Sequence, residues 1–191
     1  MPGSRKAQAR EVTSLPTTEA PQPGGLCFRP LTAEDLPLLQ RWLSEGAALE
    51  WYALRVPPTA EAVSRKYLPR VRGEEPVDAK ILLIAGQPAG YFQSYRLEDF
   101  PDHPAAAYAK RAAGIDFFLA QEHVGHGVGP RAIAAFVREV VFARPEVEIC
   151  FADPAPRNQR SVRALRRAGF REVQGDDKSA DRAALLLYIA R

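Results

Sequence analysis

Cysteine and long apolar runs are scarce in this chain of 191 residues. The two cysteines, Cys27 and Cys150, make neither a disulfide framework nor a metal site, so we expect two buried thiols in a reduced, cytoplasmic setting. The longest purely apolar stretch, residues 183–190, is far shorter than the roughly 20 residues that a membrane-spanning helix needs. The N-terminal segment also has no apolar core of a secretory signal. We therefore predict a soluble protein with no membrane partner.

The chain carries little net charge. Lys and Arg number 26 and Asp and Glu number 23, and the formal net charge of +3 is too small to predict binding to nucleic acid. An arginine-rich stripe runs through residues 157–167, but no set of aromatic residues accompanies it for stacking on bases. We therefore predict no nucleic-acid partner. The stripe suits a solvated helix face, part of which could attract a phosphate group.

Histidine is also rare. The three histidines are His103, His123 and His126, and only the last two are close in sequence, without a flanking carboxylate–histidine motif. This pattern predicts no metal site. Neither cysteine has an obvious base nearby, which argues against a cysteine nucleophile.

Proline and glycine are concentrated in residues 1–25, which hold four prolines, three glycines and no aromatic residue. Burial cannot offset the ordering entropy of such a segment, so we predict a flexible tail. The remaining residues, 26–191, suit a single domain with a full core, because 46% of the chain is hydrophobic.

Hydrophobic spacing and turn residues divide this domain into mixed strands and helices, which predicts an α/β or α+β sheet domain. We expect strands at residues 27–29, 80–85, 91–95, 114–120, 146–151, 170–173 and 184–190. We expect helices that start near residues 32–35 and that span residues 59–68, 131–143 and 158–168. The helix over 59–68 should end before Pro69, and the five residues 86–90 should connect a hairpin.

A glycine-rich loop opens one of these helices. Gly125, Gly127 and Gly129 follow a predicted strand, and Pro130 is expected at the first helical position. Backbone N–H groups at the positive end of a helix dipole bind phosphate oxygens, and glycine lets a ligand approach closely. The spacing does not fit the dinucleotide fingerprint or the nucleotide P-loop. Either another phosphorylated ligand binds here, or the glycines only make a tight strand-to-helix turn.

The loop over residues 124–129 resembles the acetyl-coenzyme A loop of the GCN5-related N-acetyltransferase (GNAT) superfamily, although Val124 stands where Gln or Arg is usual. Asn158 and the Gly169-Phe170 pair are similar to the family's Asn-containing motif. The resemblance covers residues 26–191 and implies the GNAT fold, a mixed central sheet of about seven strands flanked by about four helices, with acetyl-CoA as cosubstrate and no metal. It implies coenzyme contacts from Phe117, Phe118, Leu119, Val124, Gly125, His126, Gly127, Val128, Gly129, Arg131 and Asn158.

Several segments resemble the aminoglycoside 6'-N-acetyltransferases in particular, among them residues 90–95, 114–116 and 153–156. This resemblance implies transfer of acetyl to the 6'-amine of an aminoglycoside and a part in antibiotic resistance. Siderophore-biosynthesis acetyltransferases share the Asp-Pro, Asn and Gly-Phe pattern. A siderophore precursor or another small amine is therefore an alternative acceptor.

Acetyl transfer to an amine needs a group that removes or relays a proton, because an aliphatic ammonium has a pKa of about 10. Asp116 follows Gly114 on the predicted central strand and matches the subfamily's active-site aspartate, so it is the expected catalytic residue; a solvated strand-end carboxylate is the alternative. The expected substrate contacts are Trp51, Tyr52, Gln93, Asp99, Asp102, Asp153 and Asp181. Acidic loop residues are often merely solvated, and the two aromatic residues suit either sugar stacking or core packing.

One departure from the family concerns the leaving group. Many members carry a tyrosine that protonates the departing thiolate, and Leu165 stands at the matching position. Water or another hydroxyl must then supply the proton, or the thiolate must leave unassisted. A coenzyme-binding protein with little turnover is therefore a second alternative, and we expect a monomer or a homodimer.

Overall fold

A seven-stranded sheet forms the centre of the computed structural model, which describes residues 25–52, 55–108, 110–173 and 185–191. The strands are β1 (Leu26–Pro30), β2 (Val77–Ile84), β3 (Gln87–Arg96), β4 (Ala112–Leu119), β5 (Ile149–Ala152), β6 (Arg171–Glu172) and β7 (Leu187–Ala190). They lie in the order β1-β2-β3-β4-β5-β7-β6, in which β4 and β5 are parallel and the other described pairs are antiparallel. Except for Gly25, the tail predicted over residues 1–25 lies outside the described residues.

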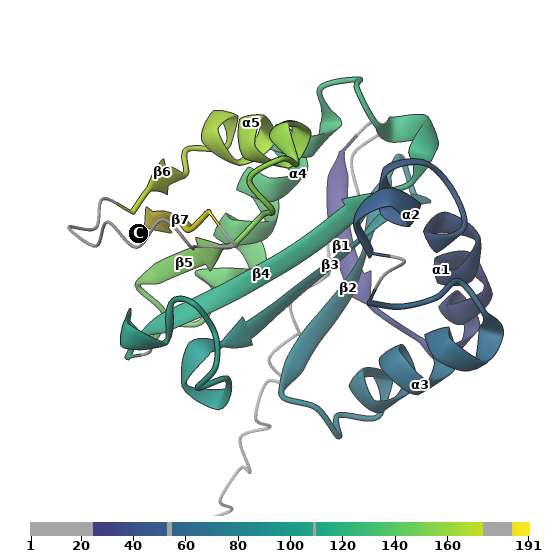
Figure 1. The fold of residues 1–191 in the computed structure, drawn as a ribbon, viewed down its shortest axis with the longest axis horizontal. Helices are drawn as coiled ribbons and strands as arrows, with labels where there is room; N and C mark the ends of the chain where they lie inside the picture. The colour runs from purple at the N-terminus through teal and green to yellow at the C-terminus, as the bar shows by residue number, and fades with distance from the viewer. Residues whose placement is uncertain (1–24, 53–54, 109, 174–184) are drawn as a thin grey trace, which may run out of the picture.

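Helices cover both faces of the sheet (Figure 1). The described α-helices are α1 (Leu36–Leu43), α2 (Gly46–Tyr52), α3 (Ala60–Val71), α4 (Val128–Phe136) and α5 (Gln159–Arg167). In Figure 1, α1, α2 and α3 lie together on one side of β4, and α4 and α5 lie on the other. None of the described helices is both long and apolar enough to cross a bilayer.

Strand residues alternate between the two faces and build a separate core on each. The core under α1 and α3 includes Trp42, Tyr67, Ile81, Tyr91 and Phe118. The core under α4 includes Leu82, Phe92, Ile115, Ile133 and Phe136. On β4, the even-numbered side chains therefore face α1 and α3, and the odd-numbered ones face α4 and α5.

The predicted mixed sheet domain is confirmed, but the helices α2, α3 and α4 differ from expectation. Helix α2 was not predicted; two of its seven residues, Trp51 and Tyr52, were expected only as substrate contacts. Helix α3 continues past Pro69 to Val71, so the predicted end at Leu68 is wrong. Proline lies in the last turn here, and the chain still closes that turn with a hydrogen bond from the Arg72 N–H to the Leu68 carbonyl at 3.1 Å.

The hairpin between β2 and β3 and the start of α4 also differ from the prediction. The hairpin between β2 and β3 has two central residues rather than five, because Ile84 already pairs with Gln87. Ala85 and Gly86 both have positive φ, 49° and 79°, as a hairpin turn of the mirror-image type requires. Helix α4 begins at Val128, so Pro130 is its third residue and not its first. That position still needs no N–H partner within the helix.

The parallel pair at the centre of the sheet separates after three residues. β4 and β5 pair from Ala112 to Gly114, whereas β4 stays paired with β3 as far as Leu119. The Glu148 N–H donates to the Arg111 carbonyl at 2.8 Å, and the Ala120 N–H donates to the Ala89 carbonyl at 2.9 Å. Main-chain groups alternate along a strand, so those of the odd-numbered residues 115, 117 and 119 face the gap beside β5.

We predict that Gly114→Ala destabilises the protein. A Cβ at this position would lie 2.4 Å from Cε2 of Tyr95, whose buried ring cannot easily move away. The free energy of unfolding, measured by urea titration, should fall by about 1–3 kcal/mol. Gly129→Ala is the matched control, because its Cβ would meet its nearest atom at an ordinary 3.6 Å. Equal stability of the two variants would contradict this account of the contact between β3 and β4.

Candidate active site

Three cavities that share lining residues adjoin β4. The glycine-loop cleft, about 290 Å³ in volume, lies between α2, β4, the loop before α4, and α5. The central pocket holds Asp116 and Asp153, and it shares Trp51, Tyr52 and Asn158 with the glycine-loop cleft. The outer pocket lies beside α3 and β3 and shares Asp116 with the central pocket. Asp116 therefore lies in the wall between the central pocket and the outer pocket and lines both.

The glycine-loop cleft collects most of the residues expected to bind coenzyme. Phe117, Phe118, Leu119, Val124, Gly125, Gly127, Gly129 and Asn158 all line it. The side chains of the other three expected residues do not: His126 and Arg131 are exposed, and Val128 packs against the core. Their main-chain groups belong to the same loop and to the first turn of α4.

The loop itself is built to leave space for a ligand. Gly125 and Gly127 have φ values of 91° and 75°, and a Cβ added to either would meet nothing within 4 Å. Gly127 is the N-cap of α4 and offers no side chain to the helix. The first N–H groups of α4 therefore have no side-chain cap, at the positive end of the helix dipole.

Helix α5 forms the opposite wall of the glycine-loop cleft. The Asn158 Oδ1 accepts a hydrogen bond from the Ser161 N–H at 3.1 Å and so begins the helix, which leaves the amide NH₂ as its donor toward a ligand. Arg160, Arg163 and Arg167 line the same wall. The arginine stripe is thus partly a positive surface of the cleft and not only a solvated face.

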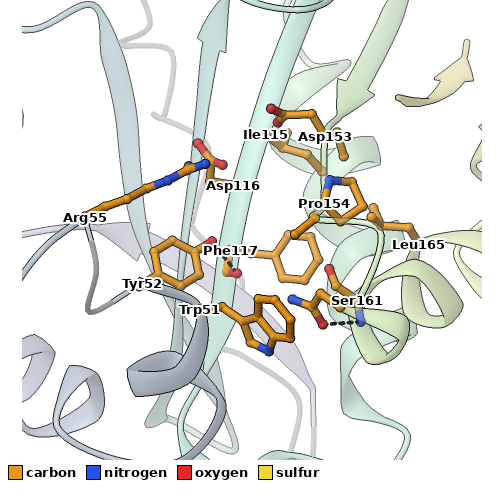
Figure 2. A pocket seen from close by; sticks show the side chains of 13 residues that line it. Trp51, Tyr52, Arg55, Ile115, Asp116, Phe117, Asp153, Pro154, Ser161 and Leu165 are labelled. Atoms are coloured by element: carbon orange, nitrogen blue, oxygen red, sulfur yellow. Dashed lines mark hydrogen bonds between the residues drawn. The ribbon is translucent and has the colours of Figure 1, made fainter. Parts of the chain in front are cut away.

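Asp116 lines the central pocket, together with Asp153 (Figure 2). Its Oδ2 accepts a hydrogen bond from Gln93 Nε2 at 2.7 Å, across a pair of residues that lie directly opposite each other on β3 and β4. Burial and the nearby charge of Asp153 raise the pKa of Asp116, while Gln93 and Arg55 oppose that change. The net result is a carboxylate with a pKa above its ordinary value, which binds a proton more readily than a solvated aspartate.

Tyr52 is held more firmly than a residue that only stacks on a substrate. Its Oη donates to the Phe117 carbonyl at 2.9 Å, a contact drawn in Figure 2, and its ring packs edge-on against Phe118 with centroids 5.2 Å apart. Burial raises the pKa of Tyr52 well above its usual value, so the hydroxyl keeps its proton. The ring of Trp51, the residue before it, has its centroid 5.9 Å from the guanidinium carbon of Arg157.

Leu165 occupies the wall of the central pocket and is 1% exposed. It carries no proton that could be given to a leaving group. Ser161 lies one helical turn earlier on α5 and lines the same pocket. Ser161 and Tyr52 are therefore the two hydroxyl groups that the described residues place there.

The outer pocket contains the acidic residues predicted from the loop after β3. Asp99 and Asp102 line it with Gln93 and Asp116, whereas Asp153 faces the central pocket. Asp181 lies outside the described residues. The structure thus gathers the other six expected substrate residues, which are far apart in sequence, around two adjoining pockets.

The pocket residues that were not predicted from the sequence include Arg55, Lys66, Arg70 and His103. Lys66 and Arg70 are four residues apart on α3, and the predicted helix end at Leu68 hid this spacing. The His103 Nδ1 accepts from the Ala105 N–H at 3.0 Å, so the neutral ring carries its proton on Nε2. That Nε2 is buried without a hydrogen-bond partner in the described part of the chain, 3.8 Å from Asp153 Oδ1.

Known proteins are similar to this chain in sequence and in fold. Residues 32–176 match the family described as the acetyltransferase (GNAT) domain. Aminoglycoside N(6')-acetyltransferase type 1 of Klebsiella pneumoniae is 34% identical over 167 residues, which cover 86% of this chain and 82% of that protein. A kanamycin resistance protein of Rhizobium radiobacter is 38% identical over 79 residues, which cover 41% of this chain and 71% of that protein.

Solved structures agree with the sequence relatives. The aminoglycoside acetyltransferase AAC(6')-Ib in complex with coenzyme A superposes with a TM-score of 0.76 at 33% identity, over 87% of this chain and 95% of that one. The same enzyme with coenzyme A and kanamycin gives a TM-score of 0.75 at 34% identity, with the same two coverages. The resemblance seen in the sequence motifs and the GNAT fold that it implied are therefore confirmed, and this chain belongs to the GNAT family of acetyltransferases.

Proposed function

We propose that this protein transfers acetyl from acetyl-CoA to the 6'-amine of an aminoglycoside by direct transfer. The observation that carries the proposal is the place of Asp116, which lines both the central pocket and the outer pocket. A cofactor entering from the glycine-loop cleft and an amine entering from the outer pocket would meet there. The relatives that cover most of this chain are aminoglycoside 6'-acetyltransferases.

The glycine-loop cleft suits coenzyme A. The open space at Gly125 and Gly127 and the uncapped N-terminus of α4 fit a pyrophosphate, and the α5 arginines fit a further phosphate. The main-chain groups of residues 115–119 that face the gap fit the amide-containing arm, with the Asn158 amide on the other side. When bound, acetyl-CoA supplies an activated acetyl thioester.

Asp116 would prepare the amine. An amine reaches the site mainly as an ammonium ion, which has no lone pair for attack. The carboxylate of Asp116 first attracts the cation and then accepts one of its protons, which frees the lone pair of the nitrogen. Burial favours this step because it raises the pKa of the carboxyl toward that of the amine.

The outer pocket suits a substrate with several positive charges. Asp99, Asp102 and Asp116 line it, against the cations Lys66 and Arg70. Arg70 already forms an ion pair with Glu75, with Nε and Oε2 3.0 Å apart. The carboxylates thus outweigh the cations that a substrate would meet, as binding of a polyamine requires.

A coenzyme-binding protein with little turnover is the second candidate, favoured by Leu165 in the wall of the central pocket. Thiol release with a panel of amines separates the candidates: kanamycin as the aminoglycoside, a hydroxylated lysine as the siderophore precursor, and spermidine as a simple polyamine. The proposal requires the highest kcat/KM with kanamycin. Binding of coenzyme A without thiol release from any amine would favour the second candidate.

We predict that Asp116→Asn lowers kcat/KM for the accepted amine by about 10²–10⁴-fold, because the amide cannot accept the proton. The dissociation constant of coenzyme A, measured by calorimetry, should stay nearly unchanged, since Asp116 does not line the glycine-loop cleft. Asp78→Asn is the control, because Asp78 pairs with Lys80 on β2 and lines none of the three cavities. An unaltered rate in the Asp116 variant would remove it as the base.

We predict that Gly127→Val weakens coenzyme A binding by about tenfold or more, because valine strains a backbone with φ of 75° and fills the open space. Calorimetric titration with coenzyme A measures the effect. Gly86→Val imposes the same kind of strain at φ of 79°, in the hairpin turn between β2 and β3. Similar losses of affinity in both variants would mean that the loop acts only through overall stability.

A further inference from the structure

A buried arginine lies behind the proposed base, on the face of the sheet that α3 covers. The Arg70 side chain is 6% exposed and rests over the Tyr67 ring, 5.3 Å from its centroid. Its Nη1 donates to Tyr91 Oη at 3.1 Å and also to Gln93 Oε1. None of these contacts takes part in the chemistry described above.

These contacts determine which way the Gln93 amide faces. Arginine has only donors, so the end of the amide that meets Arg70 must be the carbonyl oxygen. Tyr91 Oη accepts from Arg70 and donates to the same Gln93 Oε1 at 2.7 Å. The NH₂ end of the amide is thereby turned toward Asp116, and Nε2 lies 2.7 Å from Oδ2.

The opposite amide orientation would be unfavourable at both ends. The NH₂ group would face the donors of Arg70, and the carbonyl oxygen would face the Asp116 carboxylate. Without Arg70, the Tyr91 hydroxyl could rotate and accept from the NH₂ group instead. Arg70 and the ionised Asp116 carboxylate therefore each satisfy only one of the two orientations, and Arg70 is the one of the two whose hydrogen-bonding does not change when Asp116 gains a proton.

We propose that Arg70 is a positioning residue for the transfer reaction: it fixes the amide orientation of Gln93 and so keeps an N–H donor on the Asp116 carboxylate. The effect of Arg70 on catalysis rests on the proposed function, whereas the orientation of the Gln93 amide does not. It links Glu75 at the surface, through Arg70 and Gln93, to the proposed base.

Several other charged or titratable groups also face Asp116. They are Arg55 and Tyr52 beside α2, Lys66 and Tyr67 on α3, Tyr91 and Tyr95 on β3, and Asp153 after β5, with His103 next to Asp153. Among the described residues, only Gln93 is hydrogen-bonded to the Asp116 side chain. Arg70 also acts on Asp116 by its charge alone, which favours the ionised carboxylate. A test must therefore separate this direct charge effect from an effect that passes through Gln93.

The first test uses the full chain without any substrate. The side-chain ¹⁵N signals of glutamine are recorded by NMR against pH, and Gln93→Met identifies the Gln93 signal by its loss. The Gln93 signal should titrate with Asp116, because its NH₂ group donates to that carboxylate. In Arg70→Met the midpoint should rise by about one pH unit, since the carboxylate loses a donor and a nearby positive charge.

The second test is a double-mutant cycle that follows the acid limb of the pH profile of kcat/KM. Arg70→Met alone should move the limb to higher pH by about one unit, because Asp116 must lose its proton before it can act as a base. In the Gln93→Met background, Arg70→Met should move the acid limb by clearly less than it does in the otherwise unchanged protein. Equal shifts in the two backgrounds would show that only the charge of Arg70 matters and would overturn the proposal.

Arg65→Met is the matched control, an arginine on the same helix that is 71% exposed and, among the described residues, pairs with Glu61 alone. It should leave the acid limb and the NMR midpoint unchanged. If no amine is acetylated at any pH, the proposed function fails, whereas the NMR titration still tests whether removing Arg70 shifts the midpoint of the Gln93 signal. An unchanged Gln93 midpoint in folded Arg70→Met would overturn the positioning role even in an active enzyme.

Discussion

The separation of β4 from β5 after three paired residues is the constraint on which the rest of the site depends. A strand that loses its neighbour keeps a row of main-chain donors and acceptors without partners, and burying them unpaired is unfavourable. Here the row faces the cleft between the glycine loop and α5. A chain-like ligand with amide groups can complete the missing pairs, so the break in the sheet and the binding site are one feature.

Main-chain groups and side chains of β4 point in different directions, and this separates the two parts of the site. The main chain of Phe117 points along the sheet into the gap, while the side chain of its neighbour Asp116 points out of the sheet toward α3. The cofactor side and the acceptor side thus meet at adjacent residues of one strand. Rigid pairing with β3 fixes both, which is how a site built on a sheet holds its geometry.

Local signals in the sequence were enough for the parts of the site that depend on local structure. The glycine loop, Asn158 and Asp116 were found because their chemistry follows from neighbouring residues or from a family motif. Arg70 was missed because Pro69 suggested a helix end at Leu68, whereas packing of Tyr67 and Arg70 on the sheet carries α3 three residues further, to Val71. Amide orientation at Gln93 and the unpaired His103 depend on contacts across 23 residues or more, or on burial, and no local pattern records them.

The hydrogen bond from Tyr52 gives the open edge of β4 a chemical polarity. Its hydroxyl donates to the Phe117 carbonyl, so at this residue the edge offers a ligand an N–H donor and a carbonyl that already accepts one hydrogen bond. A ligand segment that presents a carbonyl there is matched, whereas one that presents an N–H competes with an internal tyrosine. A single side chain on α2 thus influences which ligand group pairs with Phe117, through a contact that lies within the protein itself.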